Sequence, residues 1–342
     1  MFFTSGTVTR VTVSRQQWLV GVLLSVLVGG LVSIQSIANG TLRVRSDDPF
    51  LPSLANFVIA GAIIAVIVLV QPSRRARAKS YLRQLRSREL PWLVATAGLF
   101  GVVFSVAQAT SVAIIGVAVF TVAVIAGQNL GGLGVDRLGL SGTGVFGLDA
   151  LRIVAALIAT LAVVIAVLGR IGSLHAPITL VVFVIIGGVC VSVQLALSGR
   201  ITVAVQDPFV ASLNVFVGGT LGLLVAIAVH TFVAAPHFVE TVAAIASAPW
   251  LIVGGLCAAV MMTASAIAVP RVGVLVFTMA TVIGQLLLAL IIDTIVGTPT
   301  DPLTLVIACV LTVASVIMAG RSASQRRKES NDASRTRAVP KG

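Results

Sequence analysis

Ten long apolar stretches recur along the chain and alternate with short polar or glycine-containing segments. Each is long enough to cross about 30 Å of hydrocarbon as a helix. Helices satisfy their own backbone hydrogen bonds in lipid, and the alternating pattern of a membrane barrel is not seen. The sequence therefore predicts an all-α integral membrane protein with ten transmembrane helices. They run roughly over residues 17–38, 51–71, 91–111, 113–135, 150–169, 178–198, 209–233, 249–269, 272–296 and 302–320.

The scarce polar residues of this apolar chain occur in two matching series. Asp48-Pro49-Phe50 returns 159 positions later as Asp207-Pro208-Phe209, and Gln35 returns as Gln194. Composition alone does not produce such matches, because Asp, Pro and Gln are rare here. The sequence is therefore an internal duplication. Further matches pair Gly116 with Gly273, Gly127-Gln128 with Gly284-Gln285, and Asp136 with Asp293.

Each half holds five predicted spans, which is an odd number, so the second half must enter the membrane from the opposite side. The halves, residues 17–169 and 170–320, are therefore expected to form an inverted repeat. Two such halves can exchange conformations and open a central site to either face. This organisation is typical of transporters that work by alternating access. Residues 1–16 are expected to form a cytoplasmic N-terminus, and residues 321–342 a basic, disordered cytoplasmic tail.

The distribution of charge predicts the orientation in the membrane. Only 10% of residues are charged, and the net charge of +12 comes mainly from residues 72–90 and the tail. With both termini in the cytoplasm, every basic residue lies inside except Arg43, Arg45 and Arg170, as the positive-inside rule requires. The basic clusters are thus read as orientation signals, and binding to anionic lipid headgroups is the alternative. A cleaved signal peptide over the first span is a further alternative, disfavoured by the repeat partner of that span.

Several motifs within this frame carry a family resemblance. They are Gln35 with Asn39-Gly40, Ser53-Leu54-Ala55-Asn56-Phe57, Pro270-Arg271-Val272-Gly273, and Gly127-Gln128 followed by Asp136-Arg137-Leu138-Gly139. Over roughly residues 17–320 the chain resembles the bacterial YdcZ-type family of the drug/metabolite transporter superfamily, in a fused two-repeat form. The resemblance implies a ten-helix fold, a place in the bacterial inner membrane, and export or uptake of small molecules.

Three positions depart from that family pattern. Ser198 stands where Asn would match Asn39, and Ile114 stands where Arg would match Arg271. After Asp293 the expected glycine comes one place late. We therefore expect the two halves to have specialised, so that the binding site is not fully symmetric.

Uncharged amides within the spans are the candidate substrate ligands, because polar side chains inside a membrane often mark a pathway. The repeat-related pairs Gln35/Gln194 and Gln128/Gln285 are expected to meet across the pseudo-two-fold axis. Amides both donate and accept, so they suit a neutral or zwitterionic solute; hydrogen bonds between helices are the alternative role. The predicted substrate-binding set is Gln35, Asn39, Gln128, Gln194, Ser198 and Gln285.

Charged residues near the span ends are weaker candidates for gating or coupling. Asp48 and Asp207, each followed by proline, suit helix capping, and gating is the alternative. Asp136 and Asp293 end the fourth and ninth spans, where a carboxylate could couple transport to protons. Arg271 lies in a very short turn, where it either attracts an anionic group of the substrate or reaches the membrane interface.

These observations favour a secondary transporter, and a lipid or lipid-linked-intermediate flippase is the alternative. No phosphate-binding loop, nucleophile–base pair or metal-ligand cluster is evident, so we expect no enzyme activity, cofactor or metal. The expected partners are a small-molecule solute, membrane lipids and, as one option, a second copy of the chain. Because the charge follows the membrane loops, no nucleic-acid partner is expected.

Overall fold

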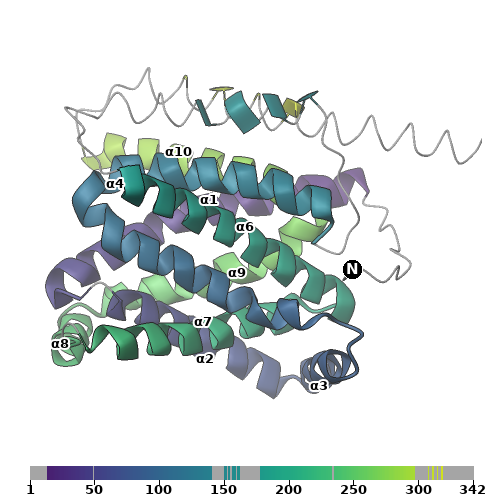
Figure 1. Ribbon diagram of the computed structural model, residues 1–342, viewed down its shortest axis with the longest axis horizontal. Helices are drawn as coiled ribbons and strands as arrows, with labels where there is room; N and C mark the ends of the chain where they lie inside the picture. The colour runs from purple at the N-terminus through teal and green to yellow at the C-terminus, as the bar shows by residue number, and fades with distance from the viewer. Residues whose placement is uncertain are drawn as a thin grey trace, which may run out of the picture.

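The computed structural model (Figure 1) describes residues 14–48, 50–140, 178–232 and 235–296, with scattered positions between 150 and 161 and between 307 and 318. Every element assigned in these segments is helical. The elements are α1 (Arg15–Ser46), α2 (Leu51–Val70), α3 (Pro72–Arg86), η1 (Trp92–Thr96), α4 (Ala97–Leu138), α6 (Ile178–Val205), α7 (Pro208–His230), α8 (Phe238–Ser247), η2 (Pro249–Ile252), α9 (Val253–Val272) and α10 (Val274–Val296).

Five stretches of the described residues are long and apolar enough to cross a membrane as single helices. They are Arg15–Gln35, Leu51–Val70, Ile178–Val205, Pro208–His230 and Pro249–Val272. The spans expected at 150–169 and 302–320 lie largely outside the described residues. The helical, multi-pass character is therefore confirmed, and the number of ten spans stays a prediction.

Helix α4 covers most of the residues of the expected third and fourth spans. Two separate helices were expected, whereas α4 is assigned as one helical run of 42 residues, which would be about 63 Å long if straight. However, neighbouring glycines of α6 contact distant parts of it: Gly187 lies against Phe104 and Ala107, and Gly188 lies against Gly127. The helix must therefore fold back into two antiparallel arms, which Figure 1 shows joined at the left. Helical bonding persists into the turn because lipid offers the backbone no other partners.

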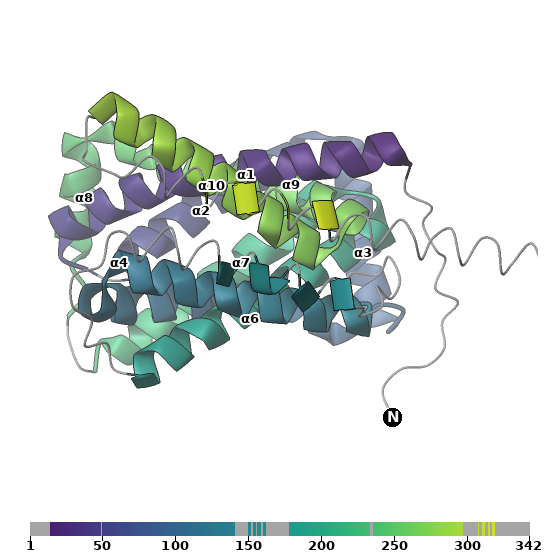
Figure 2. The same cartoon turned by 90° about the horizontal axis from the view of Figure 1, so that it is seen from above.

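Two glycine crossings hold helices of different halves together. Gly29 of α1 meets Gly284 of α10, and Gly188 of α6 meets Gly127 of α4. A side-chain carbon at any of these glycines would overlap a backbone carbonyl of the partner helix. The two crossings are equivalent in the repeat, because Gly29 corresponds to Gly188 and Gly127 corresponds to Gly284. Figure 2 shows α1 with α10 along one edge of the bundle and α4 with α6 along the opposite edge.

Two further contacts join the halves at opposite ends of the bundle, where Figure 1 shows α3 and α8. At one end Asp207 Oδ2 lies 3.8 Å from the guanidinium of Arg77 in α3. At the other end Asp48 Oδ2 accepts a hydrogen bond from the backbone of His237, which precedes α8, at 3.1 Å. The predicted topology assigns the members of each contact to the same face of the membrane. The contacts agree with that topology, and which end faces the cytoplasm stays a prediction.

Asp136 connects the end of α4 to the start of α10. It is 0% exposed, and its two carboxylate oxygens accept from the backbone nitrogens of Val274 at 2.9 Å and Leu275 at 3.2 Å. Only Gly273 separates α9 from α10, with φ of +82°, and a side-chain carbon there would lie 2.9 Å from Asp136 Oδ2. Asp136 thus caps a helix of the other half, which satisfies amides that would otherwise be exposed to an apolar environment.

We predict that Asp136→Ala lowers the free energy of unfolding by about 2 kcal/mol, because two buried amides of α10 lose their acceptors. Asp136→Asn keeps one carbonyl acceptor and should lose less. Glu89→Ala, at an exposed position without a positive φ, is the control. Thermal unfolding of the purified protein in detergent measures all three, and equal stability of Asp136→Ala and the wild type would contradict the capping role.

We also predict that Gly188→Ala destabilises the fold by about 1–3 kcal/mol, because its methyl group meets the backbone of α4. Gly134→Ala is the matched control in the helix that Gly188 contacts. Nothing lies within 4 Å of the added carbon there, so this change should be neutral or stabilising through helix propensity. The same unfolding assay distinguishes the two, and equal effects would show that the crossing is not tightly packed.

Candidate functional site

Two polar side chains of α6 lie buried one helical turn apart. Gln194 is 8% exposed and Ser198 is 0% exposed. Neither the Oε1 atom of Gln194 nor the hydroxyl oxygen of Ser198 has a hydrogen-bond partner within the described part of the protein. A buried polar group without a partner is destabilising by about 1–3 kcal/mol. Stability alone therefore does not account for this pair. Within the described residues, the other buried side-chain atoms without a partner belong to Ser46, Arg74, Ser111 and Asn129. Of this described set, only Gln194 and Ser198 lie one turn apart on one helix, which makes them the strongest candidate for contact with a ligand.

The Gln194 amide lies where helices of both halves meet. Its Nε2 donates to the Sδ atom of Met262 in α9 at 3.6 Å, and a thioether is a weak acceptor. The amide faces Gly101 in the first arm of α4, where a side-chain carbon would lie 3.2 Å from the amide carbon and closer still to Oε1. Glycine at 101 thus leaves the space that the amide occupies. Since α4 belongs to the first half, Gln194 bridges the two repeats.

Asn39 of α1 and Asn56 of α2 form a second polar pair. Asn56 Nδ2 donates to Asn39 Oδ1 at 2.5 Å, and both side chains face Gly254 of α9. In the repeat, Ser198 corresponds to Asn39 and Val215 corresponds to Asn56, so the second half lacks this pair. The bond supports a role for Asn39 between helices. The comparison of the two halves shows that Ser198 is a buried position at which their sequences differ.

Helix packing bears on the expected meeting of the paired glutamines without locating their side chains. Among the described helices, α1 packs mainly against α9 and α10, whereas α6 packs mainly against α4, α7 and α9. The expected meeting of Gln35 with Gln194 is therefore not supported. Gln128 and Gln285 are half-buried, and their backbone nitrogens lie beside the two glycine crossings. A substrate-binding role for Gln35, Gln128 and Gln285 stays a prediction.

The aspartates before α2 and α7 act as helix caps, which confirms the structural interpretation of the Asp-Pro motifs. Asp48 Oδ1 accepts from the backbone nitrogens of Phe50 at 2.8 Å and Leu51 at 2.9 Å. Asp207 Oδ1 accepts from Phe209 at 2.9 Å. Their second oxygens make the contacts between halves described above. No observation tests a gating role for either residue.

The remaining charged candidates lie around the α9–α10 junction and along α10. Asp136 caps α10, and Arg271 donates to the carbonyl of Ile267 one turn earlier in α9. The very short turn expected around Arg271 is confirmed, because Gly273 alone links α9 and α10. Asp293 lies in α10, with its side chain outside the described part. Coupling by either aspartate, and attraction of an anionic substrate by Arg271, stay predictions.

Comparison with known proteins places the chain in a family. Residues 20–165 and 179–319 match the family described as "Putative inner membrane exporter, YdcZ", once in each half. No curated protein matches the chain. A solved structure described only as "Crystal structure of protein" is 20% identical with a TM-score of 0.62, over 91% of this chain and 98% of that chain, and this likeness concerns the fold alone. The chain therefore belongs to the YdcZ family of inner membrane exporters and carries the unit of that family twice.

Proposed function

We propose that this protein is a secondary transporter that exports small metabolites or drugs across the inner membrane by alternating access. The observation that carries the proposal is the buried pair Gln194 and Ser198, which has two unpartnered oxygens and whose Gln194 amide faces Gly101 of the first half. Polar groups inside a membrane protein commonly mark the pathway of a solute. Membership of a family described as inner membrane exporters also supports a transport function.

The chemistry of this pair suits an uncharged or zwitterionic solute with N–H or O–H groups. The Gln194 carbonyl accepts hydrogen bonds, and the Ser198 hydroxyl both accepts and donates. The aspartates described above lie at helix ends, where their carboxylates are occupied as caps. A solute bound at Gln194 would therefore be held by hydrogen bonds rather than by a fixed charge.

The symmetry of the contacts supports the proposed movement. The two glycine crossings are equivalent contacts between the halves, so the helices of each half can rearrange around them in the same way. Asp136 joins α4 to α10 at one end of the bundle, and the register assigns its counterpart, Asp293, to the opposite end. In the proposed cycle, the Asp136 contact holds one end closed, and its release accompanies closing of the other end.

A lipid flippase, the second candidate, would need a polar path that opens to lipid between helices. The groove between η1, α4 and α7 faces outward, but its lining is apolar apart from Thr96. This lining favours the solute carrier. The experiment below nevertheless includes lipids among the ligands, so that the two candidates give different results.

We predict that Gln194→Leu abolishes stabilisation of the protein by its soluble ligand while leaving the fold intact. Removing a buried amide that lacks a full set of partners should be neutral or stabilising in the absence of ligand. A panel of metabolites and drugs is added to the purified protein and thermal unfolding is recorded. A ligand at about a hundred times its dissociation constant adds about 2.7 kcal/mol to the wild type.

The matched control is Gln71→Leu, an exposed glutamine at the end of α2, which should respond to the ligand as the wild type does. A ligand that stabilises Gln194→Leu as strongly as the wild type would remove Gln194 from the site. Stabilisation by lipids alone, with no response to any soluble compound, would favour the flippase.

A further inference from the structure

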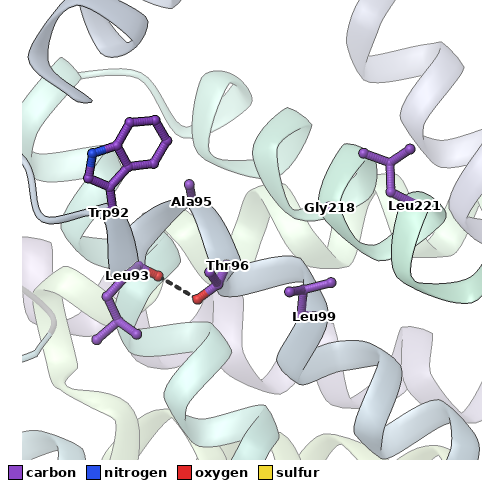
Figure 3. Close-up of a pocket in the computed structure, with 7 residues that line it drawn as sticks. All are labelled: Trp92, Leu93, Ala95, Thr96, Leu99, Gly218 and Leu221. Atoms are coloured by element: carbon purple, nitrogen blue, oxygen red, sulfur yellow. Dashed lines mark hydrogen bonds between the residues drawn. The ribbon is translucent and has the colours of Figure 1, made fainter. Parts of the chain in front are cut away.

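An apolar groove lies on the outside of the bundle. It has a volume of about 520 Å³ and is lined by η1, the start of α4, and α7. Figure 3 shows Trp92 and Leu93 toward one end and Leu221 on the facing helix. Trp92 is 62% exposed and Leu221 is 59% exposed, so the groove presents apolar surface rather than a closed core. Its volume falls within the roughly 300–1,000 Å³ of ligand pockets.

Helix α3, which carries an exposed row of positive charge, ends beside the Trp92 end of the groove. Arg88 precedes Trp92 by four residues, so their Cα atoms are at most about 14 Å apart. Leu90 donates to the carbonyl of Gln84 at 3.1 Å, which turns the chain back tightly toward η1. One acidic residue, Glu89, lies in this turn. The exposed basic residues of α3 and the turn are Arg75, Arg77, Lys79, Arg83, Arg86 and Arg88.

Asn214 of α7 fixes the basic helix and the groove relative to each other. Its Oδ1 accepts from the hydroxyl of Tyr81 in α3 at 2.9 Å, and its Nδ2 donates to the carbonyl of Val94 in η1 at 3.1 Å. Burial raises the pKa of the Tyr81 hydroxyl, which therefore remains a donor at neutral pH. Gly218, which lines the groove, follows one turn later on α7. The charged end and the apolar groove thus form one rigid surface.

We infer that this surface binds an anionic phospholipid, with an acyl chain in the groove and the phosphate beside the basic end of α3. An exposed tryptophan at the mouth suits the level of the headgroups. A basic helix at that level attracts anionic lipid by about 1 kcal/mol per charge. Arg74 stacks on Phe209 at 3.6 Å and Arg77 lies 3.8 Å from Asp207, so these two are used within the fold. The basic residues that carry the inference are Arg75, Lys79, Arg83, Arg86 and Arg88.

The corresponding positions in the described residues of the other half differ at both features. In the repeat, Ile59 corresponds to Gly218, and the Ile59 side chain packs against Gly255 of α9. At that end α8 carries Glu240 and no arginine or lysine. In the described residues, the basic helix therefore lies beside a groove, whereas the equivalent helix α8 has no basic residue and an isoleucine stands at the position of Gly218. The inference depends on the membrane location and not on the proposed solute site.

The charge is tested by titrating the purified full chain with phosphatidylglycerol and, separately, with phosphatidylcholine, and counting bound lipids by native mass spectrometry. The variant Arg86→Gln with Arg88→Gln should bind phosphatidylglycerol about 25-fold more weakly, or about fivefold per charge. Arg43→Gln with Arg45→Gln, at the opposite end, should bind as the wild type does. Equal binding of both lipids by the wild type would overturn the inference.

The groove is tested with Ala95→Phe, whose ring fills it. This variant should retain at least tenfold less phosphatidylglycerol than the wild type, whereas Ala62→Phe, on the exposed face of α2, should not. Unchanged lipid binding by Ala95→Phe would overturn the inference. Loss of a dimer in Ala95→Phe, with lipid binding unchanged, would instead identify the groove as a contact between two copies. The ligand response at Gln194 is measured separately, so either result leaves the transport proposal intact.

Discussion

Close approach of helices at the two glycine crossings is the constraint on which the rest of the bundle depends. In lipid there is little hydrophobic driving force between helices, so packing and hydrogen bonds must hold them together. Gly29 with Gly284 and Gly127 with Gly188 bring α1 to α10 and α6 to α4 without intervening side chains. Because each crossing joins one half to the other, neither half forms its packed core alone. Because the two crossings are equivalent, the two halves can undergo equivalent conformational changes around them.

Polar residues in this bundle divide into those with partners and those without. Asp48, Asp136 and Asp207 each satisfy backbone amides at a helix start, and each also connects the two halves. Asn39 and Asn56 bond to each other. Gln194 and Ser198 are as buried as these residues but retain oxygens without partners. Ser111 and Asn129 also carry such an oxygen, but Gln194 and Ser198 place two of them one turn apart on α6. Since unsatisfied groups are destabilising, this clustering makes the pair a candidate binding site.

Repeated motifs made much of this arrangement predictable from the sequence. The Asp-Pro caps depend on local spacing, and the family motifs around Asp136 and Gly273 proved to be the two sides of one contact. The surroundings of Gln194 could not be predicted in this way. Gly101 corresponds to Ala258 in the other half, and Met262 is one of many apolar residues, so no pattern marked their approach to the amide. The turn within α4, by contrast, lies between Ala107 and Gly127, in agreement with the boundary expected near residue 112.

The central claim, that the two halves exchange equivalent conformations, is tested most directly by distances between spin labels. Leu23 and Leu130 lie toward the Asp136 end, and the register relates them to Val182 and Leu287 toward the other end; all four are exposed. Double electron–electron resonance is recorded for both pairs in otherwise wild-type protein and in Asp136→Ala. The account predicts that Asp136→Ala lengthens the Leu23–Leu130 distance and shortens the Val182–Leu287 distance. Distances that stay unchanged, or that move in the same direction, would contradict it.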